Sequence, residues 1–210
     1  MKRWMMTVFV LTLAVIISAC TGEEEGQGSE NQEDRTEQGQ EEGADGGTTD
    51  TDGEQNSATE EEEKLVSLGG DDGTVVATAT LTEADTGVTI KLEGSDLPEG
   101  KHGFHIHENA ECEQSDFESA GGHFNPTEAS HGFDNPDGPH AGDLPNIEVN
   151  EDGTVDEEVT AEMVTLNKGE DNSLYSNGGT SLMIHAEEDD YETDPAGDAG
   201  DRIACGTIEE

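Results

Sequence analysis

The sequence predicts an all-β domain, a sandwich or a barrel, over residues 65–210. Short segments in which apolar and polar residues alternate recur along this stretch, separated by Gly, Asp, Asn and Pro. Alternation with a period of two is typical of a strand that is buried on one face. No window of useful length has a convincing helical period, and 146 residues suit one domain. These observations together favour a β-sandwich or β-barrel.

Eight segments carry the strand pattern. In one of them Thr78 and Thr80 alternate with Ala77 and Ala79, and the sequence EDG at 151–153 is a good hairpin turn between two others. The predicted strands are Leu65–Leu68, Thr74–Leu81, Gly87–Leu92, Gly103–Glu108, Ile147–Asn150, Thr154–Ala161, Ser181–Ala186 and Arg202–Ile208.

Two connections, Asn109–Pro145 and Ala186–Asp201, are too long to be simple turns. Long irregular loops in a compact β domain are usually functional or disordered. Three histidines, His123, His131 and His140, fall in the first loop, which favours function. Metal ligands and a disulfide could order polar segments that would not fold alone.

The first 20 residues have the layout of a secretory signal peptide. Lys2 and Arg3 precede the apolar run Met5–Ile17, and small residues lead to Cys20. This end resembles a bacterial lipobox, in which the cysteine is lipidated and becomes the mature N-terminus. A plain signal peptide or a short membrane anchor is the alternative.

Residues 21–64 are expected to form a disordered, acidic tether. They carry 17 acidic residues, only Arg35 and Lys64 as basic ones, and almost no apolar residues. Without apolar burial nothing offsets the entropy of ordering such a segment. We expect it to hold the following domain away from a membrane without taking part in chemistry.

The folded unit is also strongly acidic, with 35 acidic residues against Lys91, Lys101, Lys168 and Arg202. A nucleic-acid partner is excluded, because no basic patch is available to neutralise phosphates. The excess acid is either a solvated surface suited to high salt or a negative face that binds cations. Its dispersion over the whole unit favours the first, a halophilic adaptation.

With Cys20 assigned to lipid, Cys112 and Cys205 remain in a secreted chain. An oxidising compartment favours one disulfide between them, and two free thiols are the alternative. The disulfide would close a loop of about 90 residues, worth roughly 4 kcal/mol in the chain-entropy model.

The sequence GFHIHE at 103–108 is the stretch around which the chemistry is expected. In a strand, His105 and His107 share one face while Phe104 and Ile106 share the other. An isolated HxH pair is more often accidental than a pair of ligands. It gains weight from His123, His131, His140 and Asp143, because imidazoles with a carboxylate suit zinc and an imidazole-rich site suits copper.

The chain resembles the copper/zinc superoxide dismutase family over about residues 65–208. The motifs appear in the family's order: GFHIHE, GGHFNP around His123, His131, HAGD at 140–143, His185 and RIACG at 202–206. The resemblance implies an eight-stranded Greek-key β-barrel or sandwich, immunoglobulin-like, with two long functional loops. It also implies copper and zinc as cofactors.

The resemblance assigns a role to each matching residue. Copper would be bound by His105, His107, His123 and His185, and zinc by His123, His131, His140 and Asp143, so that His123 bridges the metals. Asp189 would link a copper-ligand and a zinc-ligand imidazole, although it could be one more acid in an acidic run. Arg202 would guide the anion, Cys112 and Cys205 would form the disulfide, and His102 would be structural.

The implied activity is disproportionation of superoxide to dioxygen and hydrogen peroxide by Cu(II)/Cu(I) cycling, with Arg202 and His123 as catalytic residues. A copper-binding or copper-buffering surface lipoprotein of the same fold with little turnover is the first alternative. A structural domain that binds only zinc is the second.

The expected location is extracytoplasmic, with lipid on Cys20 anchoring the chain to the outer face of a bacterial cell membrane. The sequence identifies no dimer surface.

Overall fold

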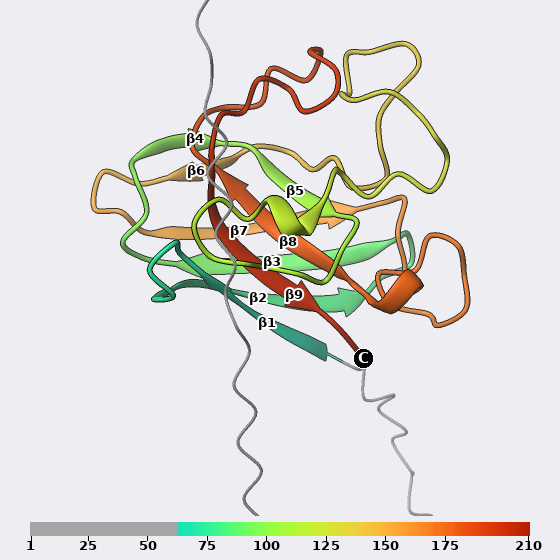
Figure 1. Ribbon diagram of the computed structural model, residues 1–210, viewed down its shortest axis with the longest axis horizontal. Coiled ribbons are helices and arrows are strands. Elements are labelled where there is room, and N and C mark those ends of the chain that lie inside the picture. The colour runs from blue at the N-terminus through green and yellow to red at the C-terminus, as the bar shows by residue number, and fades with distance from the viewer. Residues whose placement is uncertain (1–62) are drawn as a thin grey trace, which may run out of the picture. The chain divides into compact units, whose positions relative to one another are not determined.

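The computed structural model describes residues 63–210, and β-strands dominate this part of the chain (Figure 1). Its elements, in order, are β1 (Glu63–Gly69), β2 (Val75–Glu83), β3 (Val88–Gly94), β4 (Gly100–His102), β5 (Phe104–His107), the 3-10 helix η1 (Glu118–Ala120), β6 (Ile147–Val149), β7 (Val155–Ala161), the 3-10 helix η2 (Ser176–Gly178), β8 (Thr180–His185) and β9 (Arg202–Ile208). The all-β prediction is confirmed.

The described residues contain nine strands where eight were predicted. The additional strand is β4, which Gly103 separates from β5. The chain changes partner at this glycine, since β4 pairs with β6 while β5 pairs with β8. A Cβ atom at Gly103 would lie 2.8 Å from the Cβ of Ala199, so a larger residue does not fit. A three-residue strand is too short for the alternation pattern to reveal it.

The strands form a curled antiparallel sheet that nearly closes on itself. Seven strands follow the order β5-β8-β9-β1-β2-β3-β7, and β4 and β6 form a separate pair. β4 continues into the edge strand β5, and β6 continues through the turn at Asn150–Thr154 into the other edge strand, β7. The small pair therefore bridges the two edges of the large sheet, which leaves little strand edge unpaired.

The interior of the barrel is filled by the alternating residues that the sequence pattern indicated. On β2, Ala77, Ala79 and Leu81 are buried, while Thr78 and Thr80 are only partly so. Phe104 and Ile106 of β5 belong to the same hydrophobic core. His105 and His107 are also buried, but on the outer face of the strand. The opposite orientation of these two pairs agrees with the prediction.

The two long loops lie at the same end of the barrel, as Figure 1 shows for the yellow part of 108–146 and the red segment 186–201. Contacts join them, since Asp194 accepts a hydrogen bond from the His131 amide and the Tyr191 carbonyl accepts one from the Asp134 amide. Both loops are therefore ordered parts of the domain.

The start of the domain differs by two residues from the prediction. Glu63 and Lys64, assigned to the tether, belong to β1 and pair with Thr82 and Leu81. Main-chain pairing needs no apolar side chain, so polar residues can begin a strand. The predicted signal peptide, Cys20 and the rest of the tether lie outside the described residues. Within the described residues, no helix is long and apolar enough to span a membrane.

Candidate metal centre

Main-chain pairing along β5 brings the residues of the first loop to the histidines of the strand. The Ile106 amide donates to the Gly142 carbonyl, and the Phe124 amide donates to the Ile106 carbonyl. In this register His105 lies opposite Asp143, and His107 lies opposite His123. A Cβ at Gly142 would lie 2.3 Å from the Ile106 carbonyl oxygen, so this approach requires glycine.

The first group of side chains has four buried imidazoles with nitrogens within 4.8 Å of one another. They come from β5, the first loop and the end of β8: His105, His107, His123 and His185. Four ring nitrogens of this group are buried without a hydrogen-bond partner: Nδ1 of His105 and Nε2 of His107, His123 and His185. Unpaired buried polar atoms are energetically costly. Four imidazole nitrogens whose lone pairs converge in one place therefore fit a metal ion.

Hydrogen bonds at the opposite ring nitrogens set the tautomers of three of these histidines. His105 Nε2 lies 2.7 Å from Asp189 Oδ2, His107 Nδ1 lies 3.0 Å from the Gly121 carbonyl, and His185 Nδ1 lies 3.3 Å from the Gly200 carbonyl. Each contact requires the proton on the bonded nitrogen, because the partner is an acceptor. The lone pair of each ring is therefore on the nitrogen that faces the group.

The second group is compact and contains a carboxylate. Its members are His123, His131, His140 and Asp143, all buried. The Nδ1 atoms of the three histidines lie 2.8, 3.1 and 3.2 Å from Asp143 Oδ1. A tetrahedral ion with bonds of about 2.0–2.1 Å separates its ligand atoms by roughly 3.4 Å, so the group has the size of a zinc site.

His123 belongs to both groups. Its Nδ1 faces Asp143 in the second group, and its Nε2 is the unpaired atom in the first. One imidazole thus presents a nitrogen to each site, which is the arrangement that a bridging ligand requires. The structure places every predicted metal ligand in the group to which the resemblance assigned it.

Asp189 also links the two groups. Its Oδ2 accepts from His105 Nε2, and its Oδ1 lies 3.0 Å from His131 Nε2. The carboxylate is buried, in contrast to its exposed neighbours Glu187 and Glu188. It is therefore distinct from the acidic run in which it lies.

Burial and the two carboxylates divide the histidines by protonation. Burial lowers the pKa of His107 well below its usual value, that of His123 to about 4 and that of His185 to about 3. Burial acts on His131 in the same direction, but hydrogen bonds with Asp143 and Asp189 outweigh it and raise the His131 pKa to about 9. Three imidazoles are therefore neutral at pH 7, and His131 is protonated.

The metal groups open into a pocket, and Arg202 is the only lysine or arginine among the described residues that line it. Its lining includes His107, His123, His140 and His185, together with Arg202 and the acidic Glu108 and Glu128. Arg202 donates hydrogen bonds of 2.6 and 2.7 Å to the carbonyls of Phe117 and Gly121. These bonds fix the guanidinium beside the histidines.

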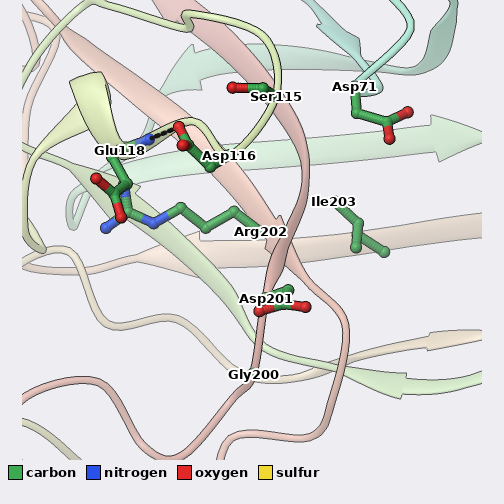
Figure 2. A pocket seen from close by; sticks show the side chains of 8 residues that line it. All are labelled: Asp71, Ser115, Asp116, Glu118, Gly200, Asp201, Arg202 and Ile203. Atoms are coloured by element: carbon green, nitrogen blue, oxygen red, sulfur yellow. Dashed lines mark hydrogen bonds between the residues drawn. The ribbon is translucent and has the colours of Figure 1, made fainter.

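A second, acidic pocket adjoins the other side of Arg202 (Figure 2). Asp116 and Glu118 lie around the guanidinium end of the side chain, and Asp201 lies nearer its backbone. Burial lowers the pKa of Arg202, while the charges of Glu118 and Asp116 oppose that shift. Arg202 thus separates an acidic surface from the imidazole-lined pocket.

The remaining predicted residues support the site from outside. Cys112 and Cys205 are joined in a disulfide, which ties the loop that contains Phe117 to β9. His102 contacts two carbonyls, with Nδ1 2.8 Å from that of His185 and Nε2 2.8 Å from that of Pro98. Its structural role was expected.

Two residues at the site have no counterpart in the sequence analysis. Asn146 forms two hydrogen bonds with the main chain of Asp189, and Tyr191 contacts both Asp189 and Asn146. Neither residue type is a common metal ligand. The only signal in the sequence is position, since Asn146 lies close to Asp143 and Tyr191 lies close to Asp189.

Comparison with known proteins gives one consistent family. A sequence profile described as copper/zinc superoxide dismutase matches residues 72–208. A curated protein of Aquifex aeolicus named as a copper/zinc superoxide dismutase is 52% identical over 137 residues, which cover 65% of this chain and 81% of that protein. Another, of Caulobacter vibrioides, is 42% identical over 139 residues, covering 65% and 80%.

Solved structures show the same similarity. A SOD-like protein from Bacillus subtilis has a TM-score of 0.68 and 41% identity, and the match covers 70% of this chain and 99% of that one. Cu/Zn superoxide dismutase from Brucella abortus has a TM-score of 0.59 and 34% identity, with 70% and 100% covered.

We predict that zinc binding at pH 8 releases about one proton. With a pKa of about 9, His131 is mostly protonated at this pH, and zinc can bind its Nδ1 only after that proton leaves. Because the pKa is raised, zinc affinity should increase up to about pH 9 and then level off. Calorimetry in buffers of different ionisation enthalpy measures the proton count.

Asp189→Asn is the control for this proton. It removes one of the two carboxylates that raise the His131 pKa, so fewer protons should be released at pH 8. Zinc binding to the unaltered chain at pH 8 without proton release would show that His131 is neutral, contrary to this prediction.

Proposed function

Because the chain belongs to the copper/zinc superoxide dismutase family, we propose that its two side-chain groups are the copper and zinc sites at which it disproportionates superoxide. Copper is held by His105, His107, His123 and His185, and zinc by His123, His131, His140 and Asp143. The observation that carries this assignment is the set of four buried, unpaired imidazole nitrogens that converge in the first group.

The two groups suit different ions. The first offers imidazole nitrogens only, which copper accepts readily, whereas the second has the mixed nitrogen and oxygen ligands and the compact size of a closed zinc site. When bound, copper supplies one-electron exchange, which zinc does not. The fit of both groups supports the enzyme over a domain that binds zinc alone.

Two side chains act directly on the substrate and its protons. Arg202 offers a fixed positive charge in the pocket and binds the small anion next to His107 and His185. His123 lines the same pocket, so its Nε2 can hold a proton where peroxide leaves. Two superoxide anions and two protons give one dioxygen and one hydrogen peroxide.

The acidic surface adapts the enzyme to high salt. In the second loop, residues 186–201 carry eight acidic residues and no lysine, and Glu108 and Glu128 line the pocket itself. This negative field repels superoxide at low salt. At 1 M salt the Debye length is about 3 Å, and most of the repulsion from distant carboxylates is lost.

The chain works outside the cytoplasm on a lipid anchor. Lys2, Arg3, the apolar run Met5–Ile17 and the small residues before Cys20 support this location. The acidic segment that follows supports a spacer between membrane and enzyme. Superoxide formed outside the cell is then the substrate.

We predict that His185→Ala strongly weakens copper binding and abolishes dismutation but leaves zinc binding nearly unchanged. His185 belongs only to the first group. Loss of this ligand should lower the copper affinity at least ~100-fold, because even hydrogen-bond partners of metal ligands change metal affinity 10–100-fold. Metal analysis and a superoxide assay on the full chain test this.

His140→Ala is the matched variant, since His140 belongs only to the second group and its loss should release zinc first. Two results for the unaltered chain contradict the proposal. Stoichiometric copper with negligible turnover would indicate a copper-buffering lipoprotein, and zinc without copper would indicate a structural domain.

We predict that the rate constant for superoxide stays level or rises between 0.05 and 1 M NaCl. Salt screens the repulsion from the acidic surface more than it weakens the short-range attraction of the partly buried Arg202. Glu128→Gln removes one carboxylate at the pocket and should raise the rate at 0.05 M while reducing the gain with salt. A steep, continuous fall with salt while both metals stay bound would refute this expectation.

We predict that Cys20→Ser releases the protein from the membrane. Lipid on a serine cannot form, so the variant should be found in the aqueous phase of a detergent partition, whereas the parent chain enters the detergent phase. Mass spectrometry of the parent N-terminus should show a lipidated Cys20. An unmodified Cys20 in a membrane fraction would favour the short membrane anchor instead.

A further inference from the structure

Tyr191 is the aromatic residue of the second loop, and its contacts converge on Asp189. The Tyr191 amide donates a 2.7 Å hydrogen bond to Asp189 Oδ1, the same oxygen that faces His131 Nε2. A left-handed backbone conformation, with φ at 61°, accompanies this turn. Non-glycine residues adopt it rarely, so surrounding contacts must stabilise it.

Asn146 closes a ring of hydrogen bonds with these two residues. Its side chain donates to the Asp189 carbonyl and accepts from the Asp189 amide, each at 2.9 Å. The main-chain amide of Asn146 donates a 2.7 Å hydrogen bond to the hydroxyl of Tyr191. Each of the three residues thus contacts the other two, and the Asp189 main chain is fixed from both sides.

Tyr191 also holds the second loop against the first. Its carbonyl accepts from the Asp134 amide, and its ring packs edge-on against Phe133 with the centroids 5.5 Å apart. Phe133 is one of four large apolar side chains exposed among the described residues. This packing gives it a function in joining the loops.

From these contacts we propose that Tyr191 is a positioning residue that holds Asp189 between His105 and His131, and thereby orients His131 for zinc. None of the contacts of Tyr191 uses a nitrogen or oxygen that faces either metal group. Tyr191 therefore acts through Asp189. This inference rests on the proposed assignment of the second group to zinc.

The test measures zinc affinity in the full chain before and after Tyr191→Phe. This change removes the hydroxyl that accepts from Asn146 but keeps the ring on Phe133 and the amide on Asp189. Partners outside a coordination shell alter metal affinity 10–100-fold, and Tyr191 lies one contact farther away, so we expect the zinc Kd to rise about fivefold. Competition with a chelating indicator measures this Kd.

A double-mutant cycle separates positioning from general stability. If Tyr191 acts through Asp189, Tyr191→Phe should leave the zinc Kd unchanged in an Asp189→Asn background. Equal weakening in both backgrounds, or no weakening in either, would overturn the proposal. The visible spectrum of cobalt bound in place of zinc should also shift in Tyr191→Phe, because the orientation of His131 changes.

Further measurements keep the result interpretable. Tyr175, the chain's other tyrosine, precedes the 3-10 helix η2 and packs against the barrel core, and Tyr175→Phe should not alter the zinc Kd. Hydrogen exchange at the Asn146 amide should become faster in Tyr191→Phe even before metal is added. If the unaltered chain fails to bind zinc, the proposed function is wrong; if it binds zinc and Tyr191→Phe has the same Kd, only this inference is wrong.

Discussion

The metal centre depends on hydrogen bonding to the main-chain amide and carbonyl groups at the free edge of β5. Buried amides and carbonyls must have partners, and at this edge no further strand within residues 63–210 supplies them. The first loop does so instead, through the main chain of Phe124 and Gly142. This pairing places His123 and Asp143 beside His107 and His105, so the backbone register and the composition of the metal groups have one cause.

The metal centre contains buried carboxylates next to histidines. Two buried carboxylates, Asp143 and Asp189, accept hydrogen bonds from histidines, which hold the pKa of both carboxyls below the usual range despite burial. His131, whose pKa is raised, lies between the two carboxylates and compensates part of their charge. Most of the other carboxylates among residues 63–210 are exposed on the surface. Arg202 is the only lysine or arginine among the described residues that line the pocket. Access of an anion is thus governed by a field that does not disturb the interior.

The sequence was informative wherever function follows from a repeating pattern. Alternation predicted the inward Phe104 and Ile106 and the outward His105 and His107, because a strand has a fixed period. It could not place His123, His131 or Asp143 in space, since loops have no period, and it was the resemblance to a family that divided the ligands between two sites. β4 and the start of β1 were missed because short or polar strands are defined by main-chain partners. Asn146 and Tyr191 were missed because their role consists of contacts between two loops.

The distribution of histidines has a practical consequence for spectroscopy. All seven in the chain are buried, six in the two groups and His102 against the carbonyl of His185. No imidazole is on the surface to add background. Every histidine ring signal in a magnetic resonance spectrum therefore originates at the centre or its immediate support. The histidine ring signals alone are therefore sufficient to follow metal binding at each of the two groups.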